Sequence, residues 1–265
     1  MNKLIILVLL ITKFSFSQET KYHDPNLDLK NGENYYLFGN DVKFRQLPDS
    51  SSEVIDLLKI GTEIQILEKT DYKLNYNGIE SSFYKVRYKD KVGYILGGLI
   101  SLEKKKFKNS TYFFVYKKVE DNYLIIIRRL NEKTEVNESS SKLITSQFSI
   151  DLYDNKGIDN LENILFINYL GEACGIDGGG IFFFQTKTEL KKVFEISQIS
   201  DAGIYWFEEN LIFPTDKKGV KGKVVYQKEI GNYEDEETNW IEIKKTSREL
   251  EWKNGSFIPN LKPEK

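Results

Sequence analysis

Residues 40–71 read NDVKFRQLPDSSSEVIDLLKIGTEIQILEKTD, and residues 81–102 read SSFYKVRYKDKVGYILGGLISL. In both stretches, short apolar runs alternate with polar residues and are separated by Pro, Ser, Gly and Lys-Asp turn sequences. Alternation of this kind places the apolar side chains of a strand on one face. Val42 and Phe44, for example, flank Lys43. The pattern predicts a small all-β barrel at residues 34–102.

The order of these runs resembles the bacterial SH3 domain, known as SH3b. An apolar strand ending in Arg precedes a Pro/Ser loop, a second strand, a Gly-Thr turn, an aromatic pair and a Gly-Tyr strand. The residues that carry the resemblance are Val42, Phe44 and Arg45; Pro48 to Ser52; Val54, Ile55 and Leu58; Gly61 and Thr62; Ile64, Ile66 and Leu67; Phe83, Tyr84, Lys85 and Val86; and Gly93, Tyr94 and Ile95. They cover about a quarter of the chain. The resemblance implies an SH3-like barrel that binds cell-wall peptides or docks within its own protein.

Three departures from the family pattern bear on the binding surface. Phe83 stands where family members often have Trp, and Gly97-Gly98-Leu99 replaces an ending in which a groove Tyr is frequent. The loop at residues 70–81 is longer than usual, and its Tyr72 and Tyr76 either replace that aromatic surface or cover the barrel. Tyrosine combines apolar area with a polar tip, which suits a contact surface. The expected ligand-binding residues are therefore Tyr72, Tyr76, Phe83, Tyr84 and Tyr94.

The rest of the chain predicts a second β-rich region. Residues 103–110 are highly charged and are interpreted as a linker, and residues 261–265 as a tail. Between them, at residues 111–260, apolar runs of strand length recur and most are bounded by Asn, Asp, Gly or Ser. The pattern predicts a larger antiparallel β domain, and it leaves a sandwich, an open sheet and a partial propeller open as topologies.

The first residues have the features of an export signal. A short positive start is followed by the apolar run Leu4 to Thr12, and small residues at Ser15 and Ser17 predict cleavage before Gln18. The run is shorter than the ~20 residues of a membrane span. Residues 1–17 are thus expected to be a signal peptide, with no membrane span after cleavage and a periplasmic or extracellular location. Residues 18–33 lack a pattern and are interpreted as a mobile leader.

Composition argues against several classes of function. The formal net charge is −2, and it becomes about −4 without residues 1–17, which contain Lys3 and Lys13 and no acid. That balance does not favour nucleic-acid binding, which needs a clustered basic surface. His23 and Cys174 are the single residues of their types, and His23 falls in the expected leader. Catalytic triads and zinc sites combine several such residues, so we expect no enzyme activity, no metal and no cofactor.

One alternative active site remains open. The segment LGEACGIDGGGIFFF at residues 170–184 contains Glu172 and Asp177, and paired carboxylates perform glycoside hydrolysis.

The main hypothesis is an exported, non-enzymatic binding protein of the cell envelope, whose partner is a cell-wall peptide or an envelope protein. The alternatives are a carboxylate-dependent hydrolase acting on glycans and a structural protein in which the barrel docks on its own β domain.

Overall fold

The computed structural model describes residues 20–132, 135–171, 178–201, 205–235 and 240–260. Within these residues, nineteen strands form three antiparallel sheets, and the one helical element is the short 3-10 turn η1, Gly97–Leu99. The predicted all-β class is confirmed. In the same part of the chain, no helix is both long enough and apolar enough to cross a membrane.

The N-terminal barrel is a six-stranded sheet in the order β2-β5-β6-β7-β3-β4. Its strands are β2 (Asn34–Tyr36), β3 (Val42–Arg45), β4 (Val54–Leu58), β5 (Glu63–Tyr76), β6 (Ile79–Tyr88) and β7 (Lys91–Leu96). Inward-facing side chains alternate with outward-facing ones as predicted: Val42 and Phe44 are buried, whereas Lys43 is exposed. The core comprises Tyr35, Leu37, Val42, Phe44, Leu58, Ile64, Ile66, Tyr84, Val86, Ile95 and Ile100.

Gly93 lets two strands of the barrel approach each other closely. A Cβ atom at this position would lie 2.6 Å from the carbonyl oxygen of Arg45 and 2.6 Å from the Phe44 ring. No side chain fits in that space, so β7 meets β3 there only because the residue is glycine.

Two further sheets follow the barrel. The four-stranded sheet has the order β11-β10-β9-β8, with β8 (Lys104–Phe107), β9 (Ser110–Val119), β10 (Asn122–Leu130) and β11 (Val136–Lys142). The nine-stranded sheet has the order β1-β12-β13-β14-β15-β16-β17-β18-β19. Its strands are β1 (Tyr22–His23), β12 (Phe148–Tyr153), β13 (Asn163–Tyr169), β14 (Gly178–Gln185), β15 (Leu190–Asp201), β16 (Tyr205–Ile212), β17 (Val224–Asp235), β18 (Trp240–Lys253) and β19 (Ser256–Ile258).

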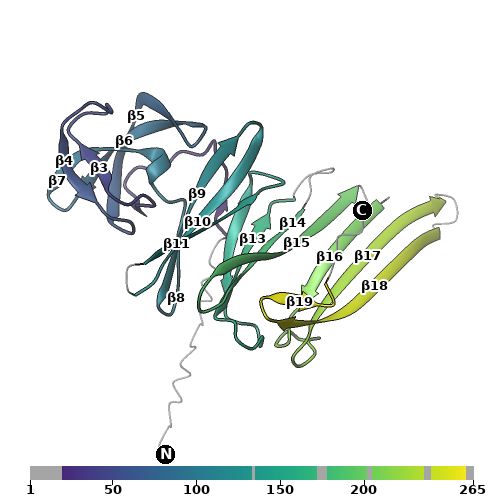
Figure 1. Cartoon of the computed structure of the whole chain (residues 1–265). Helices are drawn as coiled ribbons and strands as arrows, with labels where there is room; N and C mark the ends of the chain where they lie inside the picture. Colours follow the sequence, from purple (N-terminus) through teal and green to yellow (C-terminus); the bar gives the residue numbers. More distant parts are fainter. Residues whose placement is uncertain (1–19, 133–134, 172–177, 202–204, 236–239, 261–265) are drawn as a thin grey trace, which may run out of the picture.

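These two sheets pack against each other over part of their area. Tyr112, Phe114 and Ile125 of the smaller sheet share a core with Phe148 and Phe183 of the larger one. The larger sheet continues beyond this sandwich: its strands β16, β17 and β18 extend away from the smaller sheet (Figure 1). The β-rich region is therefore a sandwich at one end and an open sheet at the other.

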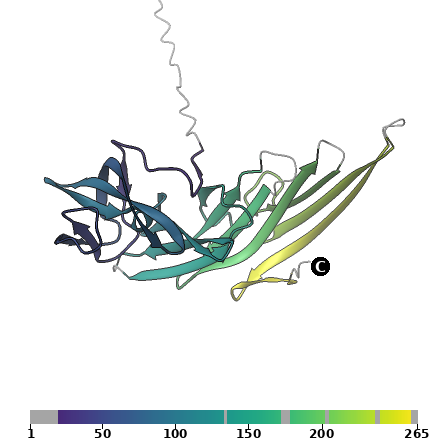
Figure 2. The same cartoon turned by 90° about the horizontal axis from the view of Figure 1, so that it is seen from above.

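The barrel packs on the opposite face of the four-stranded sheet (Figure 2). Phe38 shares an apolar cluster with Phe113, Val115 and Ile126, and the Arg128 guanidinium lies 4.4 Å from the centre of the Phe38 ring. Arg128 Nη1 also donates to the Phe38 carbonyl oxygen at 3.0 Å. Burial on both faces explains why β9 reads as a continuous apolar run and not as an alternating one.

Two segments differ from the sequence-based expectations. Residues 104–107, expected to be part of a linker, form β8 and pair with β9. Within the leader, which was expected to be mobile, Tyr22–His23 form β1 and pair with β12. Its His23 is buried, lies 5.8 Å from the Phe148 ring centre, and contacts Glu103 Oε2 through Nε2 at 3.1 Å. β8 forms a hairpin with the adjacent β9, whereas β1 is ordered by β12, a partner distant in sequence that a local pattern does not reveal.

Candidate functional site

A long arm of the barrel reaches the neighbouring sheet. The insert at residues 70–81 extends the β5–β6 hairpin, with Asn77 and Gly78 at its tip at positive φ values of 55° and 76°. The Lys118 backbone N–H donates to the Asn77 carbonyl oxygen at 2.8 Å. Ile79 packs against the core between the four-stranded and nine-stranded sheets. The insert therefore acts as a strut between the barrel and β9.

The strut encloses a groove of about 320 Å³. One wall is the leader, the second is the barrel with its strut, and the third is β9 and the chain just before β8. The lining residues are Asp24, Pro25, Asn26, Leu27, Asp28 and Leu29 from the leader; Lys69, Lys73, Tyr76, Ile79, Glu80, Ser81, Ser82, Tyr84, Gly97, Gly98 and Ile100 from the barrel; and Leu102, Val115 and Tyr116. We call this cavity the leader groove.

Two tyrosines pack on the glycine pair at one side of the leader groove. A Cβ atom on Gly98 would lie 2.7 Å from the Tyr76 ring, and one on Gly97 would lie 2.8 Å from the Tyr84 ring. The Gly98 N–H donates to Ser81 Oγ at 2.7 Å, which fixes the turn against β6. Tyr76 thus supplies aromatic surface at the place where the family's frequent tyrosine is missing from the sequence.

The leader wall is held by hydrogen bonds at several points. The Leu29 N–H donates to the Tyr84 hydroxyl at 3.3 Å, and Asp24 Oδ1 accepts from the Asn26 N–H at 2.8 Å. Gln147 Nε2 donates to Asp24 Oδ2 at 2.6 Å. Burial tends to raise the pKa of Asp24, but the hydrogen bonds from Asn26 and Gln147 outweigh it and hold this pKa below its ordinary value.

The rim of the leader groove carries both signs of charge. Lys69 Nζ lies 2.7 Å from Asp28 Oδ1, and Lys73 Nζ lies 2.7 Å from Glu80 Oε1. All four side chains are largely exposed. Exposed ion pairs contribute little to stability, so a ligand with its own charges can replace them at small cost.

The five aromatic residues expected to bind ligand separate in the structure. Tyr76 and Tyr84 line the leader groove, although Tyr84 is otherwise part of the barrel core. Phe83 is buried at 3% exposure, so the expectation that it is a surface contact is wrong. Tyr72 is 64% exposed and Tyr94 is half-buried on β7, and neither lines the groove.

The alternative acidic site, Glu172 and Asp177, lies outside the described residues, as do Cys174 and the expected signal peptide. Within the residues that the structure describes, no group of three or more His, Cys, Asp or Glu side chains is placed to hold a metal ion.

The sequence did not indicate the contributions of the leader or of β9 to the groove. Val115 belongs to a recognisable strand, but nothing local shows that it faces the barrel.

Comparison with known proteins supports the class of the barrel. Residues 40–101 match the family model of the bacterial SH3 domain, and this segment is accordingly a bacterial SH3 domain. No curated protein matches the chain. No solved structure matches it either.

Acid is expected to weaken the contact that fixes the leader. Burial tends to raise the pKa of Glu103, but His23 and Lys105 lower it below the ordinary value of 4.5. The stabilisation from this carboxylate is therefore complete above pH 4.5 and is lost as the pH falls through the lower folded-state pKa. Glu103→Gln should cost about 1 kcal/mol of unfolding free energy at pH 6.5. Urea denaturation at several pH values should show that the difference in unfolding free energy between the wild type and Glu103→Gln shrinks as the pH falls below 4.5. A difference that does not change with pH would contradict the assignment.

Proposed function

We propose that this chain is an exported, non-enzymatic binding protein of the cell envelope, and that its leader groove binds cell-wall peptide. The observation that carries the proposal is the convergence of Tyr76 and Tyr84 of the SH3 domain on a groove completed by the leader and β9. SH3 domains of this bacterial family commonly bind peptidoglycan, which supports the choice of ligand. The apolar run Leu4 to Thr12 near the N-terminus supports export.

The chemistry of the leader groove fits a peptide that carries both amines and carboxylates. Lys69 and Lys73 are available to bind a carboxylate, and Asp28 and Glu80 an amine. Between these charges, Tyr76, Leu29 and Val115 offer apolar contact. A groove with aromatic contacts and a few charged groups at defined places is typical of small-ligand and peptide sites.

Sedimentation with purified peptidoglycan tests this proposal. Tyr76→Ala is expected to weaken retention of the protein about 10-fold, which corresponds to about 1.4 kcal/mol. Tyr72→Ala is the matched control, because Tyr72 lies on the same strand, β5, but is exposed outside the groove. Its retention should equal that of the wild type. Equal retention of all three proteins, each shown to be folded by circular dichroism, would reject the groove as the binding site.

A second candidate is a purely structural role for the barrel. The apolar cluster between Phe38 and β9 supports it, because the barrel is already docked within its own chain. That contact leaves the leader groove open, since Phe38 does not line it. If peptidoglycan does not retain even the wild-type protein, while disruption of the Phe38 contact unfolds it, the structural role is the better account.

A further inference from the structure

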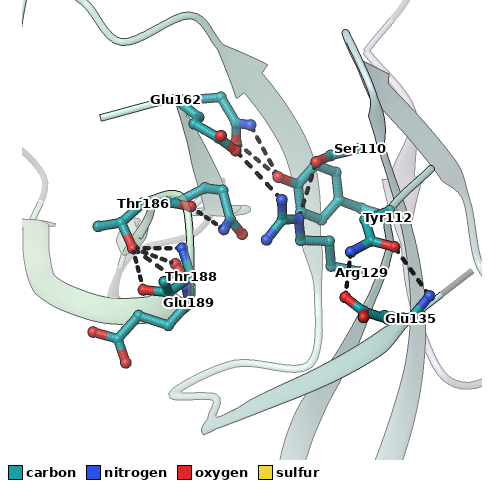
Figure 3. A network of polar contacts seen from close by, with 11 residues as sticks. Ser110, Tyr112, Arg129, Glu135, Glu162, Thr186, Thr188 and Glu189 are labelled. Carbon is teal, nitrogen blue, oxygen red and sulfur yellow. Dashed lines mark hydrogen bonds and ion pairs between the residues drawn. The ribbon is translucent and has the colours of Figure 1, made fainter. Parts of the chain in front are cut away.

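A second group of polar side chains lies between the four-stranded and nine-stranded sheets, away from the leader groove. Ser110, Arg129, Asn163 and Gln185 are all less than 9% exposed. They come from the beginning or end of four different strands: β9, β10, β13 and β14. Figure 3 shows Ser110 and Arg129 together with Tyr112, whose hydroxyl donates to Asn163 Oδ1 at 3.2 Å. Burial of polar groups costs free energy unless they are satisfied, so such a concentration needs an explanation.

Arg129 is the charged centre of this group and is 7% exposed. Its Nε donates to Ser110 Oγ at 2.9 Å, and its Nη2 lies 3.4 Å from Glu162 Oε2 (Figure 3). Within the described residues, Nη1 has no hydrogen-bond partner. The bond to Glu162 is long and involves one oxygen, whereas a guanidinium is able to hold a carboxylate through two parallel bonds. Much of the binding capacity of this side chain is therefore unused.

The guanidinium opens onto a pocket of about 430 Å³, within the usual range for small-ligand sites. We call this cavity the Arg129 pocket. Its lining residues are Phe107, Lys108, Asn109, Ser110, Arg129, Asn131, Glu132, Glu135, Glu162 and Lys187. Lys108 and Lys187 are exposed and form no ion pair among the described residues. The lining thus carries three cations and three carboxylates, together with the amide groups of two asparagines.

We propose that the Arg129 pocket binds a small zwitterionic ligand of the amino-acid or short-peptide class. The carboxylate of the ligand pairs with Arg129, assisted by Lys108 and Lys187. Its ammonium lies among Glu132, Glu135 and Glu162. A multiply charged anion is disfavoured because three carboxylates line the same cavity, and a simple amine is disfavoured by the buried guanidinium. This site is separate from the leader groove and does not depend on the function proposed for it.

Three probes separate the charges that the Arg129 pocket recognises. Glycylglycine carries both charges, N-acetylglycine only the carboxylate, and glycinamide only the ammonium. Their binding is followed by the NMR signal of the Arg129 Nε–H, which the hydrogen bond to Ser110 keeps observable. Glycylglycine is expected to bind at least about 5-fold more tightly than either other probe. Equal affinities for the three probes, or no shift up to about 50 mM glycylglycine, would overturn the proposal.

Substitutions test whether glycylglycine binds in the Arg129 pocket. Arg129→Gln removes the reporter side chain, so its binding is measured by isothermal titration calorimetry beside the wild type. The change should abolish the binding of glycylglycine, and wild-type affinity in the folded variant would refute the site. Because a change at a buried position is prone to unfold the protein, the exposed lysines that line the Arg129 pocket are tested separately. Lys108→Ala with Lys187→Ala should weaken glycylglycine about 3-fold. The control pair, Lys217→Ala with Lys218→Ala, removes two exposed lysines that do not line the pocket and should have no effect. Equal affinity in the two double variants would also refute the site.

Glu162→Gln distinguishes a binding role of Arg129 from a structural one. This change removes the carboxylate that now contacts the guanidinium. If Arg129 is part of an anion site, added N-acetylglycine should raise the melting temperature of the variant more than that of the wild type. If Arg129 only stabilises the fold through Glu162, N-acetylglycine should leave both melting temperatures unchanged, and the proposal fails.

Discussion

Replacing Phe113 with alanine is expected to lower the free energy of unfolding by about 3–5 kcal/mol. Phe113 is 1% exposed and contacts the barrel through its cluster with Phe38. A Cβ atom placed on Gly61 of the barrel would lie 3.0 Å from the Phe113 ring, so the ring fits closely against the barrel surface. Its loss leaves a cavity between the barrel and the four-stranded sheet and so weakens the joint that positions one wall of the leader groove.

Phe183→Ala is the matched control for this prediction. Phe183 is equally buried, but it lies in the core between the four-stranded and nine-stranded sheets. Urea denaturation should show similar losses of stability for both variants, whereas amide hydrogen exchange in β3 and β7 should accelerate selectively in Phe113→Ala. Equal exchange rates in the two variants would show that the barrel does not depend on this joint.

The strut is expected to fail when a side chain is added to Gly78. A Cβ atom there would lie 2.1 Å from the Lys118 carbonyl oxygen, at a φ of +76°. Gly78→Ala should therefore cost the roughly 1 kcal/mol of a left-handed non-glycine residue, and in addition the contacts between the strut tip and β9. Retention on peptidoglycan should fall, because the strut forms part of the leader groove.

Gly32 provides a control with the same backbone penalty and no clash. Its φ is +84°, and a Cβ atom there would meet nothing within 4 Å. Gly32→Ala should show the backbone cost alone and bind peptidoglycan as the wild type does. If the two variants have equal melting temperatures and equal retention, the contact between Gly78 and Lys118 does not hold the strut in place.

The barrel was predictable because its information is local. Alternation about Lys43, the turn at Gly61 and the Gly-Tyr strand that begins at Gly93 are each recognised from a few neighbouring residues. In the structure, Gly93 lies against Arg45 and Phe44, where β7 meets β3. The recurrent apolar runs after residue 110 likewise predicted strands, but not which sheet each strand joins.

The leader groove was only partly predictable because its walls come from distant segments. His23 is held by Phe148 and Glu103, and Asp24 by Gln147, contacts that no pattern within the leader reveals. Phe83 looked like a contact residue, but it belongs to the run Ser82 to Tyr84, which is buried on both faces of β6. The sequence indicated Tyr76 and Tyr84 as aromatic candidates, and both line the leader groove, but it did not indicate the leader that faces them.

The most direct measurement of the central claim is an NMR titration of the isotope-labelled protein with a soluble peptidoglycan stem peptide. A ligand in the leader groove should shift the backbone amides of Leu29, Ser81, Gly98 and Val115 together, since these residues come from all three walls. The Tyr76→Ala variant should lose these shifts at the same peptide concentration. Shifts confined to other parts of the barrel, or no shifts in a folded protein, would contradict the claim that the leader, the SH3 domain and β9 form one binding site.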